Sequence, residues 1–375
     1  RHSILFGVEC LYLLDKFFWR RCMKNWENNV RKVVPYVPGE QPQKERMIKL
    51  NTNENPYPPA PGVQKVLDEF RIDRLRKYPD PVVGKLVQAI ADYYDVKKEE
   101  VFVGVGSDDV LAMIFMTFFN SKEPILFPDI TYSFYDVWAD MLRIPYVQVP
   151  LDENFCIHAE DYNRPNGGVI FPNPNAPTGE LLPLEQVEEI IKANPDVIVV
   201  VDEAYIDFGG ESALPLIKKY DNVIVVQTFS KSRSMAGSRI GYAISNEKVI
   251  KYLNDVKYSF NSYTMDALTI ELGTAAIQDK AYFEECCEKI IATREWTKEE
   301  LKKLGFTFGD SKSNFIFATH KDIPAAEIYQ ALREVDIYVR YFGKIERIKN
   351  HLRISIGTDE EMKEFIDFLA SFINK

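Results

Sequence analysis

The chain has 375 residues, 46% of them hydrophobic and 27% charged, an ordinary composition for a globular protein with one large and one smaller core. The formal net charge of −10 argues against a nucleic-acid-binding surface. The five cysteines form no CxxC pattern, and the four histidines are scattered without a metal-binding spacing. We therefore expect a cytoplasmic protein with free thiols, no metal site and no nucleic-acid partner.

The first 22 residues differ in character from the rest of the chain. The apolar stretch 4–19 is interrupted by Glu9, Asp15 and Lys16, which makes it too short and too charged to span a bilayer. No small-residue cleavage site follows it. We expect residues 1–22 to be an upstream or non-native extension ahead of Met23, and we expect no membrane association.

From about residue 85 onward, predicted helices alternate with short apolar strands. The pattern predicts helices at 85–94, 108–119, 133–141 and 184–193, and strands at 101–103, 124–127, 146–149, 168–171, 197–201, 223–227 and 240–243. Continuous apolar strands separated by helices are typical of a mostly parallel sheet that is covered on both faces. Ligands bind such sheets at the carboxyl ends of the strands.

Beyond about residue 248 the pattern changes to an α+β module. We expect helices at 247–257, 265–304, 325–334 and 360–373, and strands at 315–318, 337–340 and 352–356. The arm at 23–51 contains three prolines and cannot form one long helix, so we expect it to pack on the smaller domain or on a partner subunit. The sequence thus predicts a large domain at 52–264 and a small domain at 265–375.

A lysine with phosphate-binding neighbours follows the strand at 223–227. Thr228, Ser230 and Lys231 stand at its end, and Arg239 lies eight residues after the lysine. A lysine at a strand end can form a Schiff base with an aldehyde, and hydroxyls beside a guanidinium can hold a phosphate. A solvated basic turn is the simpler interpretation of this stretch when it is taken alone.

Two aromatic residues and a carboxylate follow neighbouring strands. Asp202 comes directly after the strand at 197–201, where a buried carboxylate needs a partner such as a protonated pyridine nitrogen. Tyr205 is placed to reach the phenolic oxygen of such a ring, and Tyr132 is placed to stack on it. The alternatives are a helix cap for the carboxylate and half-buried packing for Tyr132.

Glycine-rich turns occur at 104–109 and 173–179. The first joins a strand to a helix, where Gly106 permits a tight turn and free amides suit a phosphate. It does not match the dinucleotide fingerprint, because Asp109 stands where the third glycine should be. The second is a Pro/Gly-rich turn that carries no chemistry by itself.

Taken together, the ordered motifs resemble fold-type I aminotransferases that depend on pyridoxal 5′-phosphate (PLP). The motifs are Gly106-Ser107-Asp108, Tyr132, Pro177-Thr178-Gly179, Asp202-Glu203-Ala204-Tyr205, Ser230-Lys231 and Arg239. Within that class the chain is most similar to the histidinol-phosphate aminotransferases. That similarity rests on residues 50–56, on residues 77–81, and on Arg340 and Arg353, which are thirteen residues apart.

The resemblance implies a fold, a reaction and a set of residue roles. The fold would be a mostly parallel seven-stranded-type sheet between helices, with a smaller α+β domain. The reaction would be PLP-dependent transamination of L-histidinol phosphate with 2-oxoglutarate, giving imidazole acetol phosphate and glutamate in histidine biosynthesis, by a homodimer. Lys231, Asp202 and Tyr205 would be catalytic. The cofactor would be bound by Gly106, Ser107, Asp108, Tyr132, Asn175, Asp202, Tyr205, Thr228, Ser230, Lys231 and Arg239, with Tyr78 from the partner subunit. The substrates would be bound by Tyr36, Asn53, Arg340 and Arg353.

The chain departs from the family pattern at one position. Ala176 stands immediately before Pro177-Thr178-Gly179, where the family usually has an asparagine whose amide bonds the phenolic oxygen. Either Asn175 takes that role or Tyr205 holds the oxygen alone. An aromatic-amino-acid aminotransferase and a threonine-phosphate decarboxylase of the same fold remain alternatives. A PLP-binding regulator and a nicotinamide oxidoreductase are less consistent with the sequence, for want of a helix-turn-helix segment and of the glycine fingerprint.

Overall fold

The computed structural model describes residues 25–37, 39–44 and 46–374. The chain divides into two compact units, residues 1–36 and 37–375. In the first unit the described residues contain a short 3₁₀ helix, η1 (Asn25–Asn29). The extension expected at residues 1–22, and the start expected at Met23, lie outside the described residues.

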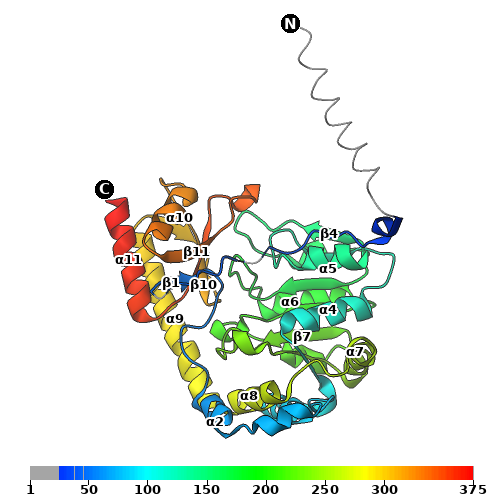
Figure 1. The fold of residues 1–375 in the computed structure, drawn as a ribbon. Helices are drawn as coiled ribbons and strands as arrows, with labels where there is room; N and C mark the ends of the chain where they lie inside the picture. The colour runs from blue at the N-terminus through cyan, green and yellow to red at the C-terminus, as the bar shows by residue number, and fades with distance from the viewer. Residues whose placement is uncertain (1–24, 38, 45, 375) are drawn as a thin grey trace. The chain divides into compact units, whose positions relative to one another are not determined.

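The second unit contains a seven-stranded sheet with the order β2-β8-β7-β6-β5-β3-β4 (Figure 1). Its strands are β2 (Val101–Gly104), β3 (Ile125–Pro128), β4 (Tyr146–Val149), β5 (Val169–Pro172), β6 (Val199–Asp202), β7 (Val223–Thr228) and β8 (Gly241–Ile244). Neighbouring strands are parallel except where β8 pairs antiparallel with β2 and β7. The predicted seven-stranded, mostly parallel sheet is confirmed.

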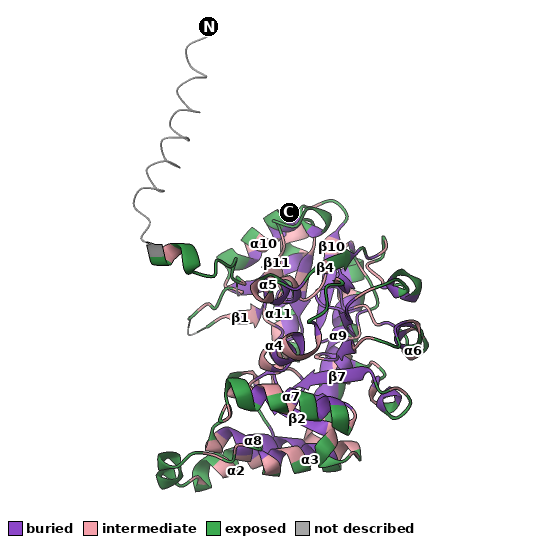
Figure 2. Cartoon of the chain, turned by 90° about the vertical axis from the view of Figure 1, so that its right-hand side faces the viewer, coloured by how far each residue is buried: buried purple, intermediate pink, exposed green. Residues whose placement is uncertain are grey.

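Helices cover both faces of this sheet, which explains its continuous apolar strands. They are α2 (Pro61–Glu69), α3 (Gly84–Tyr94), α4 (Ser107–Phe118), α5 (Tyr135–Leu142), α6 (Leu184–Ala193), α7 (Glu247–Phe260) and α8 (Ala267–Gln278). Val223 and Val225 pack into one apolar cluster with α3, α6 and α8, whereas Ile224 and Val226 pack into another with α4, α5 and α7. Successive side chains of a strand point to opposite faces, so β7 is buried along its whole length (Figure 2).

A smaller module follows, with a five-stranded sheet of order β1-β11-β12-β10-β9. Its elements are β1 (Ile48–Leu50), α9 (Lys280–Lys303), β9 (Phe306–Phe308), β10 (Phe315–His320), α10 (Ala325–Glu334), β11 (Ile337–Tyr341), β12 (Leu352–Ser355) and α11 (Asp359–Ile373). Strand β1 pairs parallel with β11, so residues 48–50 at the end of the expected N-terminal arm belong to this sheet. An apolar cluster that includes Phe315, Leu332 and Phe365 forms the core of the module.

Short 3₁₀ helices lie in the connections. They are η2 (Ile72–Arg76), η3 (Lys98–Glu100), η4 (Ala159–Tyr162), η5 (Ile206–Phe208), η6 (Leu214–Lys218), η7 (Ala236–Ser238) and η8 (Glu346–Ile348).

The stretch predicted to be helical at 265–304 contains two helices, α8 (Ala267–Gln278) and α9 (Lys280–Lys303). Asp279 leaves the helical conformation with φ −89° and ψ 75°, and its side chain caps α9 by accepting a hydrogen bond from the Tyr282 amide at 3.2 Å. Helix α8 packs against α2 and α3 beside the large sheet, although it follows the domain boundary expected at residue 265. The boundaries 52–264 and 265–375 stay a prediction.

The strand directions bring distant motifs to one edge of the large sheet. Strands β2, β3, β5, β6 and β7 all end at this edge. Because β8 runs antiparallel to β7, the residues just before β8, including Arg239, reach the same edge. The sequence had indicated that Asp202 follows the strand. In the structure Asp202 is the last residue of β6 and pairs with Pro172 and Val226.

Candidate active site

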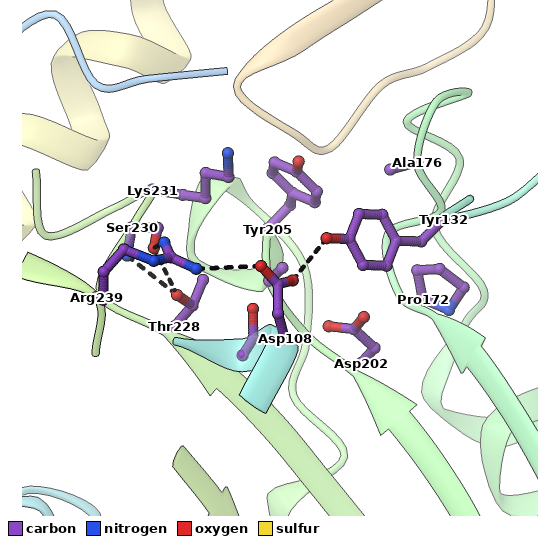
Figure 3. Close-up of a pocket in the computed structure, with 12 residues that line it drawn as sticks. Asp108, Tyr132, Pro172, Ala176, Asp202, Tyr205, Thr228, Ser230, Lys231 and Arg239 are labelled. Carbon is purple, nitrogen blue, oxygen red and sulfur yellow. Dashed lines mark hydrogen bonds and ion pairs between the residues drawn. The ribbon is translucent and has the colours of Figure 1, made fainter. Parts of the chain in front are cut away.

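The carboxyl edge of the seven-stranded sheet opens into a cavity (Figure 3). The lining residues are Ser107, Asp108, Tyr132, Pro172, Ala176, Asp202, Ala204, Tyr205, Thr228, Ser230, Lys231 and Arg239. All but Pro172, Ala176 and Ala204 are residues to which the sequence assigned a cofactor role. The structure therefore brings most of the predicted site together.

One end of the cavity gathers groups that bind anions. Arg239 donates from Nη1 to Ser230 Oγ at 3.3 Å and from Nη2 to Asp108 Oδ2 at 3.1 Å. The hydroxyl of Thr228 lies 3.0 Å from that of Ser230. Ser107 opens α4, and the first amides of a helix have no intrahelical partner. Hydroxyls, a guanidinium and a helix N-terminus thus form a phosphate-binding end.

Gly106 lies behind this end and does not line the cavity. Its backbone has φ +86°, and a Cβ at this position would collide with Arg239 Nη2. Glycine is therefore needed both for the turn into α4 and for the close approach of the guanidinium.

Asp202 lies near the middle of the cavity floor and is 4% exposed. Its Oδ2 accepts a hydrogen bond from the Tyr135 hydroxyl at 2.8 Å, whereas its buried Oδ1 has no partner among the described residues. Burial raises the pKa of this carboxyl to about 6, against the effect of the Tyr135 bond. A buried carboxylate oxygen without a partner is costly, so it marks a place where a cationic or N–H group of a ligand fits.

Tyr205 is held by a residue from a distant part of the chain. Its hydroxyl oxygen accepts a hydrogen bond from Asn53 Nδ2 at 2.9 Å. Asn53 is itself buried, and its Oδ1 accepts from the Ser355 hydroxyl at 3.0 Å. Because the Asn53 amide is the donor, the Tyr205 hydroxyl keeps its own proton for an acceptor in the cavity.

Lys231 projects into the cavity beside Tyr205 (Figure 3). Its Nζ donates to the Thr52 carbonyl oxygen at 3.1 Å and lies 5.7 Å from the centroid of the Tyr205 ring. No carboxylate forms an ion pair with Lys231 among the ion pairs of the described residues, so the amine is held by a neutral acceptor. It is thus placed to react with an aldehyde bound in the cavity.

Tyr132 stands on the opposite side from Lys231 and Arg239 (Figure 3). Its hydroxyl donates to Asp108 Oδ1 at 2.6 Å, which fixes the ring, and burial together with Asp108 raises its pKa far above the ordinary value. The same Asp108 carboxylate bonds Arg239 through its other oxygen. The cavity therefore offers an aromatic wall, a phosphate-binding end and a buried acceptor, which together fit a flat ring that carries a basic nitrogen and a phosphate.

The comparison with known proteins identifies the family. A model of the family "Aminotransferase class I and II" matches residues 45–369. The chain belongs to this family. It is 50% identical over 349 residues to the histidinol-phosphate aminotransferase of Lactococcus lactis subsp. cremoris, an alignment that covers 93% of this chain and 98% of that protein.

Solved structures of aminotransferases agree with this assignment. The crystal structure of the histidinol-phosphate aminotransferase from Clostridium acetobutylicum matches with a TM-score of 0.80 at 26% identity, over 88% of this chain and 99% of that chain. The histidinol-phosphate aminotransferase from Sinorhizobium meliloti, solved in complex with pyridoxal-5′-phosphate, matches with a TM-score of 0.79 at 25% identity, over 87% and 91%. The expected fold-type I architecture is confirmed.

Asn175 is not among the cavity residues of this aminotransferase, contrary to its predicted cofactor role. Its Nδ2 donates to the Ile130 carbonyl and to Thr178 Oγ1, both at 2.9 Å, and its Oδ1 accepts from the Thr131 hydroxyl. The hydrogen bonds of the Asn175 side chain therefore stabilise the turn at 173–179. Ala176 lines the cavity in its place.

The predicted substrate and partner residues do not line the cavity. Strand register places Arg340 directly opposite Arg353 on β11 and β12, and Arg353 Nη2 donates to the Asn51 carbonyl at 3.1 Å. Tyr78 is 82% exposed and lies 4.7 Å, ring to ring, from Tyr263. Tyr36 belongs to the other unit of the chain. The roles of these residues stay predictions.

The structure adds one residue to the site that the sequence did not suggest. Tyr135 is the first residue of α5, and its hydroxyl donates a hydrogen bond to Asp202. The only indication of this residue in the sequence is its position three residues after Tyr132.

Glu203, next to Asp202, is fully buried and accepts hydrogen bonds from Ser212 Oγ and the Ala213 amide, both at 2.6 Å. Burial raises the pKa of Glu203 to about 7.

No group of three or more His, Cys, Asp or Glu side chains in the part of the chain that the structure describes is arranged to hold a metal ion. Among the helices of that part, none is both long and apolar enough to cross a membrane.

Proposed function

We propose that this chain is a PLP-dependent histidinol-phosphate aminotransferase. It transfers the amino group of L-histidinol phosphate to 2-oxoglutarate, giving imidazole acetol phosphate and glutamate, in histidine biosynthesis. The 50% identity to a histidinol-phosphate aminotransferase over 93% of the chain supports this reaction. One structural observation supports PLP as the cofactor. The buried Asp202 oxygen without a partner among the described residues lies in the same cavity as Lys231 and the phosphate-binding end.

The residues present fit PLP at each of its functional groups. Asp202 Oδ1 would accept the N–H of the pyridine ring, and Tyr205 would donate to the phenolic oxygen. Tyr132 would stack on the ring. The phosphate would be held by Ser107, Thr228, Ser230, Arg239 and the backbone amide of Asp108. Lys231 Nζ would be the amine that meets the aldehyde.

The chain's own residues supply proton transfer and orientation. PLP, when bound, would supply an electron sink for the pair left when the substrate's α-carbon loses its proton. Lys231 is the base that takes this proton, and its bond to the Thr52 carbonyl keeps the amine at that side of the cavity. Asp202 keeps its negative charge opposite the ring nitrogen, and Tyr205 keeps its hydroxyl proton on the cavity side.

The substrates are assigned to the arginines of the small sheet. Arg353 binds the carboxylate of glutamate or 2-oxoglutarate, and Arg340 contacts the substrate near its phosphate or side-chain acid. Tyr36 is a further proposed substrate contact. The register that sets Arg340 opposite Arg353 supports a shared anion-binding face, because directly opposite residues of two strands lie on one face of the sheet. Asn53, also expected to bind substrate, has its amide engaged with Tyr205 and Ser355.

The active species is proposed to be a cytoplasmic homodimer. Tyr78 reaches the cofactor phosphate of the neighbouring subunit in this proposal. The exposure of side chains in this segment supports the proposed subunit contact, because Tyr78 is 82% exposed and Ile72 is 81% exposed. Large exposed apolar side chains close together are typical of an interaction surface.

Ala176 in place of the usual asparagine changes the affinity for the cofactor but does not prevent the reaction. The Asn175 amide holds the turn, so Tyr205 is the side chain that donates to the phenolic oxygen. One neutral hydrogen bond contributes about 0.5–1.5 kcal/mol net, which alters cofactor affinity by roughly tenfold at most.

A panel of single-turnover reactions tests the substrate. The PLP-loaded protein is mixed with L-histidinol phosphate, phenylalanine, tyrosine or threonine phosphate without 2-oxoglutarate, and the visible absorbance of the bound cofactor is followed. Histidinol phosphate should convert it fastest. Faster conversion by phenylalanine would indicate the aromatic-amino-acid aminotransferase, and release of carbon dioxide from threonine phosphate would indicate the decarboxylase.

A further inference from the structure

Tyr135 is a fully buried tyrosine that lies directly behind the cavity. It is the first residue of α5, and its ring is enclosed by other aromatic rings. The centroid distances are 6.3 Å to Phe115, 5.8 Å to Phe127, 6.4 Å to Trp138 and 5.8 Å to Tyr132. Packing therefore fixes the ring without help from the hydroxyl.

The hydroxyl of Tyr135 forms a hydrogen bond with Asp202. It donates to Oδ2 at 2.8 Å and leaves Oδ1 without a partner among the described residues. Burial and the Asp202 carboxylate hold the pKa of Tyr135 well above its usual range, so the hydroxyl remains a donor at neutral pH. Tyr135 thus fixes one carboxylate oxygen while the other stays available to the cavity.

Opposing forces act on the Asp202 carboxylate. Burial and the nearby Asp108 carboxylate favour its protonated form, whereas the Tyr135 hydroxyl and the Ala204 backbone amide favour the ionised form. The other ionisable side chains that line the cavity are Tyr132, Tyr205, Lys231 and Arg239. Of all these groups, Tyr135 is the side chain that bonds Asp202 directly.

We propose that Tyr135 is a positioning residue of this aminotransferase: its hydroxyl holds Asp202 ionised and oriented so that Oδ1 receives the N–H of the cofactor ring. The inference rests on the proposed function, because it concerns the residue opposite the cofactor nitrogen. A neutral donor suits this place better than a cation. A phenol stabilises the carboxylate without supplying a counter-charge, so the full attraction of Asp202 remains for the protonated ring nitrogen.

The test uses Tyr135→Phe, which keeps the ring and removes only the hydroxyl. The full chain is freed of cofactor, and its Kd is measured by equilibrium dialysis for PLP and for 1-deaza-PLP, in which carbon replaces the ring nitrogen. We expect the Kd for PLP to rise about ten- to a hundredfold, as for the loss of a hydrogen bond to a charged group, and the Kd for the deaza compound not to rise. Comparing two ligands on one variant cancels any general loss of folded protein.

Tyr242→Phe is the matched control. Tyr242 is also buried, and its hydroxyl donates to Gln227 Oε1 at 2.6 Å, but it does not line the cavity. This variant should leave the ratio of the two Kd values unchanged. An equal rise for both ligands in Tyr135→Phe, or no rise for either, would overturn the positioning role.

A spectroscopic measurement tests the same role independently. With PLP labelled by ¹⁵N in the ring, the nitrogen of Tyr135→Phe should lose its proton at lower pH than that of the wild type. Identical titration of the nitrogen in both proteins would overturn the inference. A wild-type chain that binds no PLP would overturn the proposed function instead, so the two failures are distinct.

Discussion

Asn53 offers a sharp test of how the two sheets jointly build the site. It lies just after β1, is 1% exposed, and has a left-handed backbone with φ +56°. Its side chain donates to the Tyr205 hydroxyl and accepts from the Ser355 hydroxyl, at 2.9 and 3.0 Å. Replacing it by alanine removes both bonds and leaves a residue that adopts the left-handed conformation less readily than asparagine does.

The expected destabilisation follows from these contacts. Each of the two buried hydrogen bonds contributes about 1 kcal/mol net, and alanine bears more of the roughly 1–2 kcal/mol cost of a left-handed backbone than asparagine does. Asn53→Ala should therefore lower the free energy of unfolding by about 3 kcal/mol. Asn53→Gly loses the same bonds but adopts the backbone freely, so it should be at least as stable as the alanine variant.

Urea unfolding of the cofactor-free protein, followed by circular dichroism, measures both variants against the wild type. Glycine normally destabilises more than alanine, so the inverted order is the signature of the left-handed backbone. A loss below about 1 kcal/mol for Asn53→Ala, or a glycine variant less stable than the alanine variant, would refute this account of Asn53.

Three further predictions concern the site. Lys231→Ala should abolish transamination and the visible absorbance of the bound cofactor, and a variant that retains both would contradict the role of this lysine. Arg239→Gln should weaken PLP binding about ten- to a hundredfold in equilibrium dialysis, while pyridoxal without its phosphate should bind both proteins alike. Glu203 has a pKa raised to about 7 in the folded chain, so its contribution to stability is present at low pH and is lost as the pH rises through 7. Glu203→Gln should remove on the order of 3 kcal/mol of that decline between pH 5 and 8 in urea unfolding, and an unchanged decline would exclude this carboxyl as its source.

The large sheet was predictable because its strands are buried on both faces. A strand such as β7 reads as a continuous apolar run, and the helices between the runs show the helical period. The break at Asp279 was missed because the apolar pattern continues on both sides of it and only the cap geometry ends the helix. Strand β1 was missed because three residues carry too little pattern, and its partner β11 lies near the other end of the chain.

The site likewise contains residues that a local sequence pattern predicts and residues that it does not. Residues at strand ends were predictable, because parallel strands deliver them to one edge. The residues behind them were not, since the pairs Tyr135–Asp202 and Asn53–Tyr205 depend on contacts between distant segments that no local pattern encodes. The orientation of the Asn175 side chain was not predictable for the same reason. Its amide could have faced the cavity or the turn, and in the structure it bonds the Ile130 carbonyl and the Thr178 hydroxyl.

These supporting bonds prepare the cavity before any cofactor binds. Tyr135 and Asn53 hold Asp202 and Tyr205 from outside the cavity, and Tyr132, which itself lines the cavity, holds Asp108. In this arrangement Asp202 Oδ1 has no hydrogen-bond partner among the described residues, and a buried acceptor that meets no donor costs roughly 1–3 kcal/mol. A ligand N–H at that oxygen removes the cost, whereas a ligand without one leaves it in place. The fold therefore favours a ligand with a protonated ring nitrogen, because Asp202 Oδ1 is a buried acceptor that such an N–H satisfies.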